Sequence, residues 1–442
     1  MLNTVNNLLW GPGTLAFLLG TGLFLTIRMH FLPWRRLPFA LQSALGKDAR
    51  TSKHGGISPF SALMTTLAAT MGTGNIVGVA TALVAGGPGA LIWMEISALV
   101  GMSTIFAESM LSVRYRRRNR QGHWYGGPMY VMESALGSRF GRISGCLFAL
   151  FATGASFGIG SMTQANAIAS ALESAFGLPI KLTGSVTTAF AVAAILGGMR
   201  SISKITSILV PLMSIFYMMA GIVVILSHPE HLLPGLASIF QCAFSAEAIA
   251  GGMAGEALRW GIARGVFSNE AGLGSAGIAA ASADTNDPVR QGYISMTGAF
   301  FDTVLVCTVT GLAICCSGVL GATDGAGTPI NGAALTLLAF ETVFGRYGSG
   351  FIAVSIVLFA FSTILGWEYQ GEQAFSYLSK GRGTFLYRTL YALTLLWGSV
   401  QQANTVYLFS DICNALMCIP NLLCVLLLHR QVIKEMRDYK NV

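Results

Sequence analysis

Charged residues are scarce in this chain. Lys, Arg, Asp and Glu make up 10% of its 442 residues, whereas 53% are hydrophobic. A soluble globular protein carries about 25% charged residues. Apolar runs long enough to cross a bilayer also recur along the whole sequence. This composition excludes an ordinary soluble protein and indicates an all-α polytopic membrane protein.

Histidine and paired cysteine motifs are also sparse. None of the six His falls in an apolar run, and the eight Cys lie in apolar runs without a CxxC spacing. The cysteines are typical of small core hydrophobes rather than metal ligands or disulfides. The spans contain neither a Ser–His pair nor an HExxH motif. We therefore expect no catalytic residues, no cofactor and no transition metal, and an intramembrane enzyme is a poor alternative.

The basic residues sit in short loops between the apolar runs. The net charge is +8, and the densest basic run is residues 114–120. Such loops mark the cytoplasmic side of a membrane rather than a nucleic-acid interface. They predict an N-terminus outside and a cytoplasmic C-terminus. Arg259 and Arg264 are taken to mark the inner end of the seventh span.

The apolar runs predict about eleven spans. They are expected at residues 8–28, 58–84, 90–113, 143–172, 183–196, 206–226, 236–267, 293–320, 351–373, 385–400 and 406–428. Residues 268–287 are too polar to span and predict a loop with a short surface helix. Residues 333–344 predict a short re-entrant or interfacial helix.

Glycines interrupt two of these spans. The second span holds Gly72 and Gly74, and the seventh has its glycines at residues 251–255. Without the first span ten remain, and each half of five begins with a broken span entering from the opposite side. Matching breaks of this kind point to the binding site of a secondary transporter. We expect an extra N-terminal helix and loop (1–56), a first inverted repeat (57–230) and a second repeat with a cytoplasmic tail (231–442).

The first break supplies polar groups at membrane depth. Free N–H groups after it suit a carboxylate, and the carbonyls of Ala68 and Met71 are left free for a cation. Side chains of Thr70, Thr73 and Asn75 add further polar groups. Close helix packing around small residues is the alternative explanation for these glycines.

Other spans add candidates of lower specificity. Gly251 and Gly252 offer a backbone patch for a small substrate, with a plain kink as an equal alternative. Gln164 needs a buried partner and should face the bundle interior. Trp367 either walls a pocket or fills the core.

The ninth span carries two adjacent hydroxyl residues. Ser362 and Thr363 share a helix face with the carbonyl of Phe359, and this oxygen set suits an alkali cation. Hydroxyls in membrane helices usually bond the carbonyl four residues back, which is the stronger explanation for this pair alone.

Acidic residues within spans are functional candidates. Glu95, Glu247 and Glu256 are candidates for tuning ion coupling, and Glu256 lies directly at the second break. Glu108 and Glu372 lie near cytoplasmic ends, where an arginine can pair with them.

Four sequence motifs together resemble the alanine or glycine:cation symporter family, also called sodium:alanine symporters. They are residues 68–80 (AATMGTGNIVGVA), 86–94 (GGPGALIWM) and 264–276 (RGVFSNEAGLGSA), and Gly366-Trp367 with Gly371-Glu372. The resemblance implies a leucine-transporter-like five-plus-five inverted repeat with one extra N-terminal helix. It also implies sodium-coupled, sometimes proton-coupled, import of a small neutral amino acid, typically alanine or glycine.

The resemblance also assigns roles to residues. The substrate would contact Thr73, Gly74, Asn75, Gln164, Gly251, Gly252 and Trp367. Sodium would bind the carbonyls of Ala68, Met71 and Phe359 and the hydroxyls of Ser362 and Thr363. A bacterial inner membrane is the expected location.

The chain departs from the family pattern at several positions. Glu95 stands where the family usually has Trp, and Gly277 and Ala280 stand where Pro and His are frequent. Proton coupling, or a preference for glutamine or serine, therefore stays open. A channel is a weaker alternative, because it needs no pair of opposed broken helices.

Overall fold

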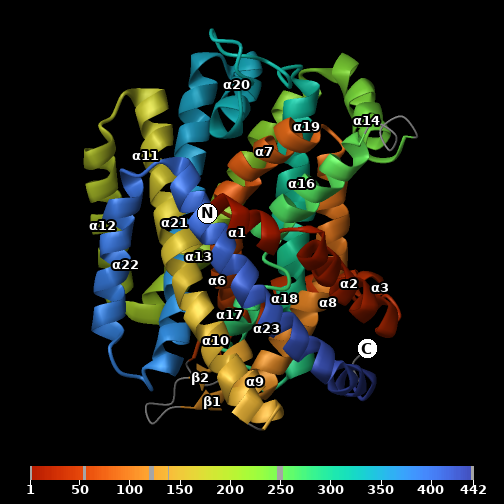
Figure 1. The fold of residues 1–442 in the computed structure, drawn as a ribbon, viewed down its shortest axis with the longest axis vertical. Helices are drawn as coiled ribbons and strands as arrows, with labels where there is room; N and C mark the ends of the chain where they lie inside the picture. The colour runs from red at the N-terminus through yellow and green to blue at the C-terminus, as the bar shows by residue number, and fades with distance from the viewer. Residues whose placement is uncertain (1, 53–55, 119–123, 138, 246–251, 440–442) are drawn as a thin grey trace.

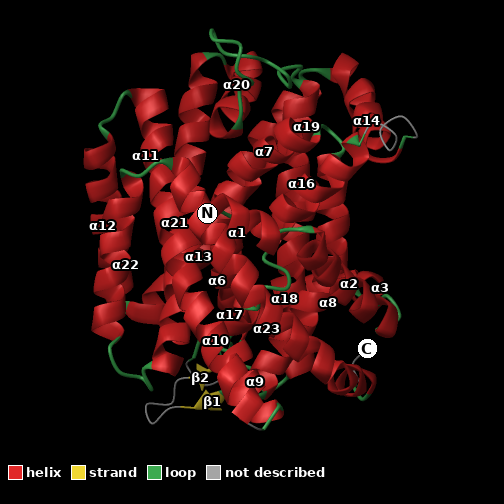
Figure 2. Ribbon diagram, viewed as in Figure 1, coloured by secondary structure: helices red, strands yellow, loops and turns green. Residues whose placement is uncertain are grey.

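The computed structural model describes the chain except residues 1, 53–55, 119–123, 138, 246–251 and 440–442. Helices fill almost all of it (Figure 2). Within the described residues, the strands are β1 (Arg117–Arg118) and β2 (Trp124–Tyr125), a short antiparallel pair at one end of the molecule. Helices α14 and α20 lie at the opposite end (Figure 1).

The expectation of a polytopic helical membrane protein is confirmed. Six helical segments of the described chain are long and apolar enough to span a bilayer. They are Ala90–Arg114, Arg139–Phe176, Gly198–Leu226, Pro288–Cys316, Arg346–Leu378 and Thr405–Arg437. Shorter apolar helices at Pro12–Arg28, Val77–Gly86, Ile180–Leu196 and Gly332–Phe344 accompany them.

The helices follow the predicted order with altered ends. Their bounds are α1 Leu2–Leu9, α2 Pro12–Arg28, α3 Leu32–Arg35, α4 Leu37–Leu45, α5 Lys47–Arg50, α6 Pro59–Thr70, α7 Val77–Gly86, α8 Ala90–Arg114, α9 Pro128–Ala135, α10 Arg139–Ala155, α11 Thr163–Phe176, α12 Ile180–Leu196 and α13 Gly198–Leu226. The second half has α14 Pro229–Phe244, α16 Met253–Asn269, α17 Ser275–Ala280, α18 Pro288–Ala299, α19 Thr308–Cys316, α20 Gly332–Phe344, α21 Arg346–Leu378, α22 Thr384–Ser399 and α23 Ala403–Arg437.

Two predicted boundaries are wrong. The first span is divided at Gly11, because Pro12 starts a new helix at a position where its missing N–H costs nothing. Residues 199–204, which separate the predicted spans at 183–196 and 206–226, are not a loop but belong to α13. The predicted helix at residues 333–344 is confirmed as α20. The predicted division at residues 56 and 230 stays a prediction.

The first predicted break is present in the structure. Helix α6 ends at Thr70, a single 3-10 turn η1 spans Thr73–Asn75, and α7 begins at Val77. All of residues 70–76 are buried. The glycine signal in this span therefore marks an unwound segment inside the protein, as expected for interrupted membrane helices.

The second broken helix lies elsewhere than predicted. Gly252 caps the exposed start of α16, so Gly255 lies in the first turn of a helix rather than in a buried break. The helix breaks at Glu270–Gly274, where Glu270, Gly272 and Gly274 have positive φ, and it resumes as α17. Residues 268–283 are buried, so the expected surface loop is wrong. Polar backbone is tolerated at this depth because surrounding protein satisfies it.

Arg116 anchors the chain just beyond α17. Its guanidinium donates to the carbonyls of Ala281, Ala283 and Thr285, and it lies 3.9 Å from the ring centre of Trp124. Burial lowers the pKa of Arg116 to about 10, which leaves it charged at neutral pH. The end of the second broken helix beyond α17 is therefore fixed to the segment that follows α8.

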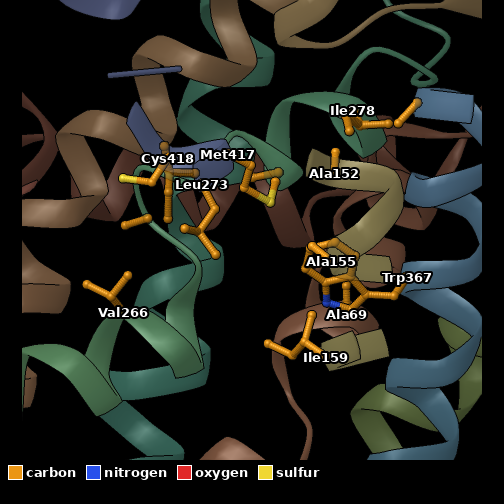
Figure 3. Packing of buried hydrophobic residues seen from close by; sticks show 14 of the residues in the cluster. Ala69, Ala152, Ala155, Ile159, Val266, Leu273, Ile278, Trp367, Met417 and Cys418 are labelled. Carbon is orange, nitrogen blue, oxygen red and sulfur yellow. The ribbon is translucent and has the colours of Figure 1, made fainter. Parts of the chain in front are cut away.

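Buried small residues let the central helices approach closely. Trp367 of α21 is 1% exposed and lies near Ala69, Ala155 and Ile159 (Figure 3). A Cβ on Gly366 would stand 2.5 Å from the backbone nitrogen of Ala69. Helix α21 therefore packs directly on the backbone of α6 at the start of the first break.

Two glycines of α16 form a matched pair for testing this close packing. Gly261→Ala should lower the unfolding temperature of the detergent-purified protein, because its Cβ would stand 2.6 Å from Cβ of Trp93. Overpacking of this kind costs roughly 1–3 kcal/mol. Gly255→Ala has open space around it and should be neutral or slightly stabilising. Equal effects of the two substitutions would contradict the packing of α16 on α8.

Candidate functional site

The structure brings together the five predicted cation ligands. The Ser362 hydroxyl donates to Phe359 O at 2.8 Å and lies 3.4 and 3.5 Å from the carbonyl oxygens of Met71 and Ala68. The Thr363 hydroxyl lies 2.9 Å from Ala68 O and 3.2 Å from Phe359 O. Both hydroxyls are at most 1% exposed. They therefore bond across to α6 in addition to their own helix.

This oxygen cluster carries no formal charge. Its members are carbonyl and hydroxyl oxygens, which are hard donors without nitrogen or sulfur. Within the described residues, no group of three or more His, Cys, Asp or Glu is placed to hold a metal ion. The cluster is thus suited to a monovalent hard cation, and its role as a sodium site stays a prediction.

Gly72 lies between this cluster and Gln164. A Cβ at Gly72 would stand 2.5 Å from Oγ1 of Thr363 and 3.3 Å from Oε1 of Gln164. Any side chain here would displace a predicted cation ligand or the amide. Because glycine has no side chain, both Thr363 and Gln164 can approach the backbone of the break at Gly72.

The Gln164 side chain forms hydrogen bonds to the first break and to the turn that precedes it in its own helical segment. Its Oε1 accepts a long hydrogen bond of 3.4 Å from the Thr73 amide, and its Nε2 donates to Ile159 O at 2.9 Å. Ile159 lies in a π-helical segment, η2 (Ser156–Met162), between α10 and α11. Such segments are frequent at functional sites. The expectation that Gln164 faces the bundle interior is confirmed by its 1% exposure.

Asn75 connects the two broken helices through a buried acid. Its Oδ1 accepts from the Gly72 amide, which closes the first break on itself. Its Nδ2 donates to Oδ1 of Asp302 at 2.8 Å and to Asp302 O at 3.0 Å. Oδ2 of Asp302 accepts from Ser268 at 2.7 Å and from Thr303 at 2.8 Å. Asp302 lies in a second π-helical segment, η3 (Phe300–Cys307).

Trp367 is hydrogen-bonded to the second break. Its indole nitrogen donates to Oε1 of Glu270 at 2.7 Å, and Oε2 of the same carboxylate accepts from Ser275 at 2.5 Å. Gly160 of η2 packs on Trp367 so closely that a Cβ there would collide with it. Trp367 therefore lies between the second break and the π segment that precedes Gln164.

A cavity of about 350 Å³ adjoins the first break. Its lining includes Thr73, Phe267 and Tyr407, together with an ion pair of 3.1 Å between Arg264 and Asp411. The buried hydroxyl of Thr73 lies beside the hydroxyl of Tyr407. Arg264 lines this cavity beside the first break and pairs with Asp411, and its use as a marker of the inner membrane boundary stays a prediction.

Several predicted residues lie outside this cluster. Gly252 is exposed at the start of α16, and Glu256 is exposed and lies 3.9 Å from Arg259. The structure thus does not bring either of them to the buried break. Gly251 and Glu247 lie outside the described residues. Thr70 is buried at the end of α6, where its hydroxyl lies 3.4 Å from Leu67 O.

Three acids of the predicted spans have defined surroundings. The carboxylate of Glu95 on α8 is buried beside the hydroxyl of Thr308 and makes no ion pair within the described residues. Glu108 accepts from Asn421 at 2.5 Å rather than from an arginine. Glu372 pairs with Arg388 at 2.6 Å, as expected for an acid near the end of a span.

The sequence reasoning missed two residues that organise the site. Asp302 lies in the predicted eighth span, where the sequence marks it only as one of several intramembrane acids. Glu270 falls in the predicted loop at residues 268–287. The available signals are the position of Asp302 inside a span and the place of Glu270 in the 264–276 motif.

Comparison with known proteins agrees with the motif resemblance. The whole chain, residues 1–442, matches the model of the sodium:alanine symporter family. The sodium/alanine symporter AgcS of Methanococcus maripaludis is 46% identical over 443 residues, which is 100% of this chain and 97% of AgcS. The probable sodium/glutamine symporter GlnT of Bacillus subtilis is 37% identical and covers 99% of this chain and 90% of its own.

A solved structure has a similar fold. The crystal structure of MhsT in complex with L-phenylalanine superimposes with a TM-score of 0.60, covering 83% of this chain and 88% of MhsT at 13% sequence identity. At this identity the likeness concerns the fold alone. The chain has the leucine-transporter-like inverted-repeat fold, in which each repeat contains a broken helix.

The hydrogen bonds of Asp302 predict a graded loss of stability. Asp302→Ala should clearly lower the unfolding temperature of the purified protein, because Asn75, Ser268 and Thr303 lose their acceptor. Each orphaned buried donor costs roughly 1–3 kcal/mol. Asp302→Asn keeps the shape and one acceptor oxygen, so it should be intermediate. Asp438→Ala at the exposed end of α23 serves as the control. If both Asp302 variants were as stable as the wild type, this network would be contradicted.

Proposed function

The chain belongs to the sodium:alanine symporter family, and we propose that it imports a small neutral amino acid, alanine or glycine, together with sodium. Its family and relatives make it a cation-coupled amino-acid symporter in a membrane, not an enzyme. The choice of sodium and of alanine or glycine is our proposal. So are a bacterial inner membrane, an outer N-terminus and a cytoplasmic C-terminus.

The convergence of five uncharged oxygens at the first break is the observation that carries the sodium assignment. Three of them are carbonyls of Ala68, Met71 and Phe359, and two are hydroxyls of α21. A sodium ion there would replace the hydrogen bonds that these hydroxyls now make. It would thereby connect α6 to α21 and hold the break in one conformation.

The proposed substrate position lies on the other side of Gly72. Thr73, Gly74 and Asn75 present backbone and side-chain groups, and Gln164 faces the same break. The free N–H groups of a helix start favour a carboxylate. Trp367, which packs near Ala69 before the first break, is hydrogen-bonded to Glu270 of the second break. We place the substrate against this second break rather than against Gly251 and Gly252.

The proposed mechanism is alternating access. In this fold the broken-helix bundle rocks against the remaining helices around a central site. Sodium bound between α6 and α21 would order the first break and so raise the affinity for the amino acid. The coupling is reciprocal, because the amino acid must raise the affinity for sodium by the same factor.

A proton-coupled symporter, or one that prefers glutamine or serine, is the alternative. The probable glutamine symporter GlnT is a relative of this chain, so the side chain of the substrate is not assigned by family alone. Glu95 gives proton coupling a specific basis, because its carboxylate is buried beside the hydroxyl of Thr308 and makes no ion pair among the described residues. A buried carboxylate without an ion-pair partner is unfavourable when it is ionised, and binding a proton would remove its charge.

Uptake into proteoliposomes tests the proposal directly. Labelled alanine, glycine, serine and glutamine are offered under a sodium gradient or a pH gradient, each imposed alone. We expect alanine or glycine to accumulate only with the sodium gradient. Accumulation driven by the pH gradient alone, or of glutamine alone, would replace the proposal by its alternative.

Thr363→Ala tests the cation site separately. Removing one oxygen ligand should raise the sodium concentration for half-maximal uptake roughly tenfold or more, since a hydrogen bond or contact to a charge is worth about 1.5–3 kcal/mol. Ser355→Ala is the matched control on the same helix, because its hydroxyl donates only to Phe351 O. An unchanged sodium titration in Thr363→Ala, with normal folding, would remove this residue from the site.

A further inference from the structure

β1, β2 and α9 lie together at one end of the molecule (Figure 1). Residues of β1, β2 and α9 also line a second, larger cavity. Its volume is about 800 Å³, and it is separate from the broken helices. Three cationic side chains line it, from β1 (Arg117), the start of α10 (Arg142) and the segment after α21 (Lys380). Glu133 is the acid among the described residues of its lining.

The cations of this cavity are not neutralised equally. Arg117 pairs with Glu133 at 3.4 Å and donates to Ser134 at 3.0 Å. Within the described part of the chain, Arg142 and Lys380 have no hydrogen bond or ion pair, and both are exposed. Two positive charges thus converge on one hollow without a protein counter-ion, which favours an anionic occupant.

Phenol groups complete the polar lining. Tyr125, Tyr130 and Tyr377 border the cavity, and the rings of the last two lie 5.0 Å apart edge to face. Burial raises the pKa of Tyr130 to about 12, so its hydroxyl stays protonated and can donate a hydrogen bond at neutral pH. Phosphate oxygens accept such bonds and pair with guanidinium and ammonium groups.

The cavity continues into an apolar helix face. Arg142 and Cys146 of α10 line it, and the neighbouring residues Ile143, Leu147 and Leu150 are exposed by 58%, 44% and 56%. In a membrane protein this stripe faces lipid tails. The junction of a basic hollow with a lipid-facing stripe, at the end rich in basic loops, matches the layout of an anionic phospholipid at the cytoplasmic leaflet.

We propose that this cavity binds the headgroup of an anionic phospholipid, with Arg142 and Lys380 on the phosphate and the acyl chains along α10. The site would connect β1, α10 and the turn after α21. These parts lie far apart in the sequence but meet at this cavity. The proposal is independent of the substrate and coupling ion of the transporter.

Cys146 provides a local reporter, because it is exposed and lines the cavity. The full chain, purified in detergent, is alkylated with N-ethylmaleimide, and modification of each cysteine is followed by peptide mass spectrometry. Added phosphatidylglycerol should slow alkylation of Cys146 roughly tenfold. Phosphatidylcholine and inorganic phosphate should not, and the partly exposed Cys242 should react at an unchanged rate.

Paired substitutions test the cations. Arg142→Gln with Lys380→Gln should raise the phosphatidylglycerol concentration needed for protection roughly 30-fold, because each cation contributes on the order of a fivefold factor. Lys434→Gln with Arg437→Gln removes the same charge from the exposed face of α23 and should change nothing. Arg142→Lys with Lys380→Arg keeps the charge and should keep protection, which separates lost binding from lost folding.

Three results would overturn the proposal. Equal protection by phosphatidylcholine would mean that acyl chains alone cover the helix face. Equal protection by inorganic phosphate would identify a site for soluble anions. Protection by phosphatidylglycerol that survives loss of both cations would show that the headgroup is not bound here.

Discussion

The backbone groups that two broken helices leave unpaired inside an apolar bundle constrain the rest of this structure. An unpaired peptide group at such depth is costly, so each needs a partner from the protein. At the first break the Gly72 amide is satisfied by Asn75, and the Thr73 amide by Gln164. The free carbonyl of Ala68 is covered by a hydroxyl of α21. The same groups that stabilise the break are the ones proposed to bind the amino acid and sodium.

The second break is stabilised by a local cap and by hydrogen bonds from other helices. The Ala271 amide is capped by Asn269, and the Gly272 carbonyl accepts from Asn421 of α23. Asn421 also donates to Glu108 of α8, so one amide joins three elements at this point. Buried acids here act as acceptors that tie segments together. Their presence in the spans therefore reflects the cost of interrupting a helix as well as any role in transport.

Sequence reasoning predicted much of the first half of the site because its signals are local. Glycine interruption at Gly72 and Gly74 and the adjacent hydroxyls of Ser362 and Thr363 identify an unwound segment and an oxygen-rich helix face without tertiary information. The second break was misplaced, because glycines in an exposed helix start look the same as glycines in a break. The polarity of residues 268–283 argues against burial, although Glu108 of α8, Trp367 of α21 and Asn421 of α23 are partners for their polar groups. Those partners lie on other helices, in part more than a hundred residues away along the chain. No local sequence pattern encodes them.

The two π-helical segments determine in which direction the side chains that follow them point around the helix axis. Each such segment holds an extra residue relative to an α-helix, and one residue corresponds to about 100° of rotation. Segment η2 precedes Gln164, and η3 contains Asp302. Loss of one residue from either would turn the rest of that helix by more than a quarter of a revolution. The polar groups at the centre would then point into lipid or neighbouring side chains, so chain length in these two segments is as restricted as residue identity.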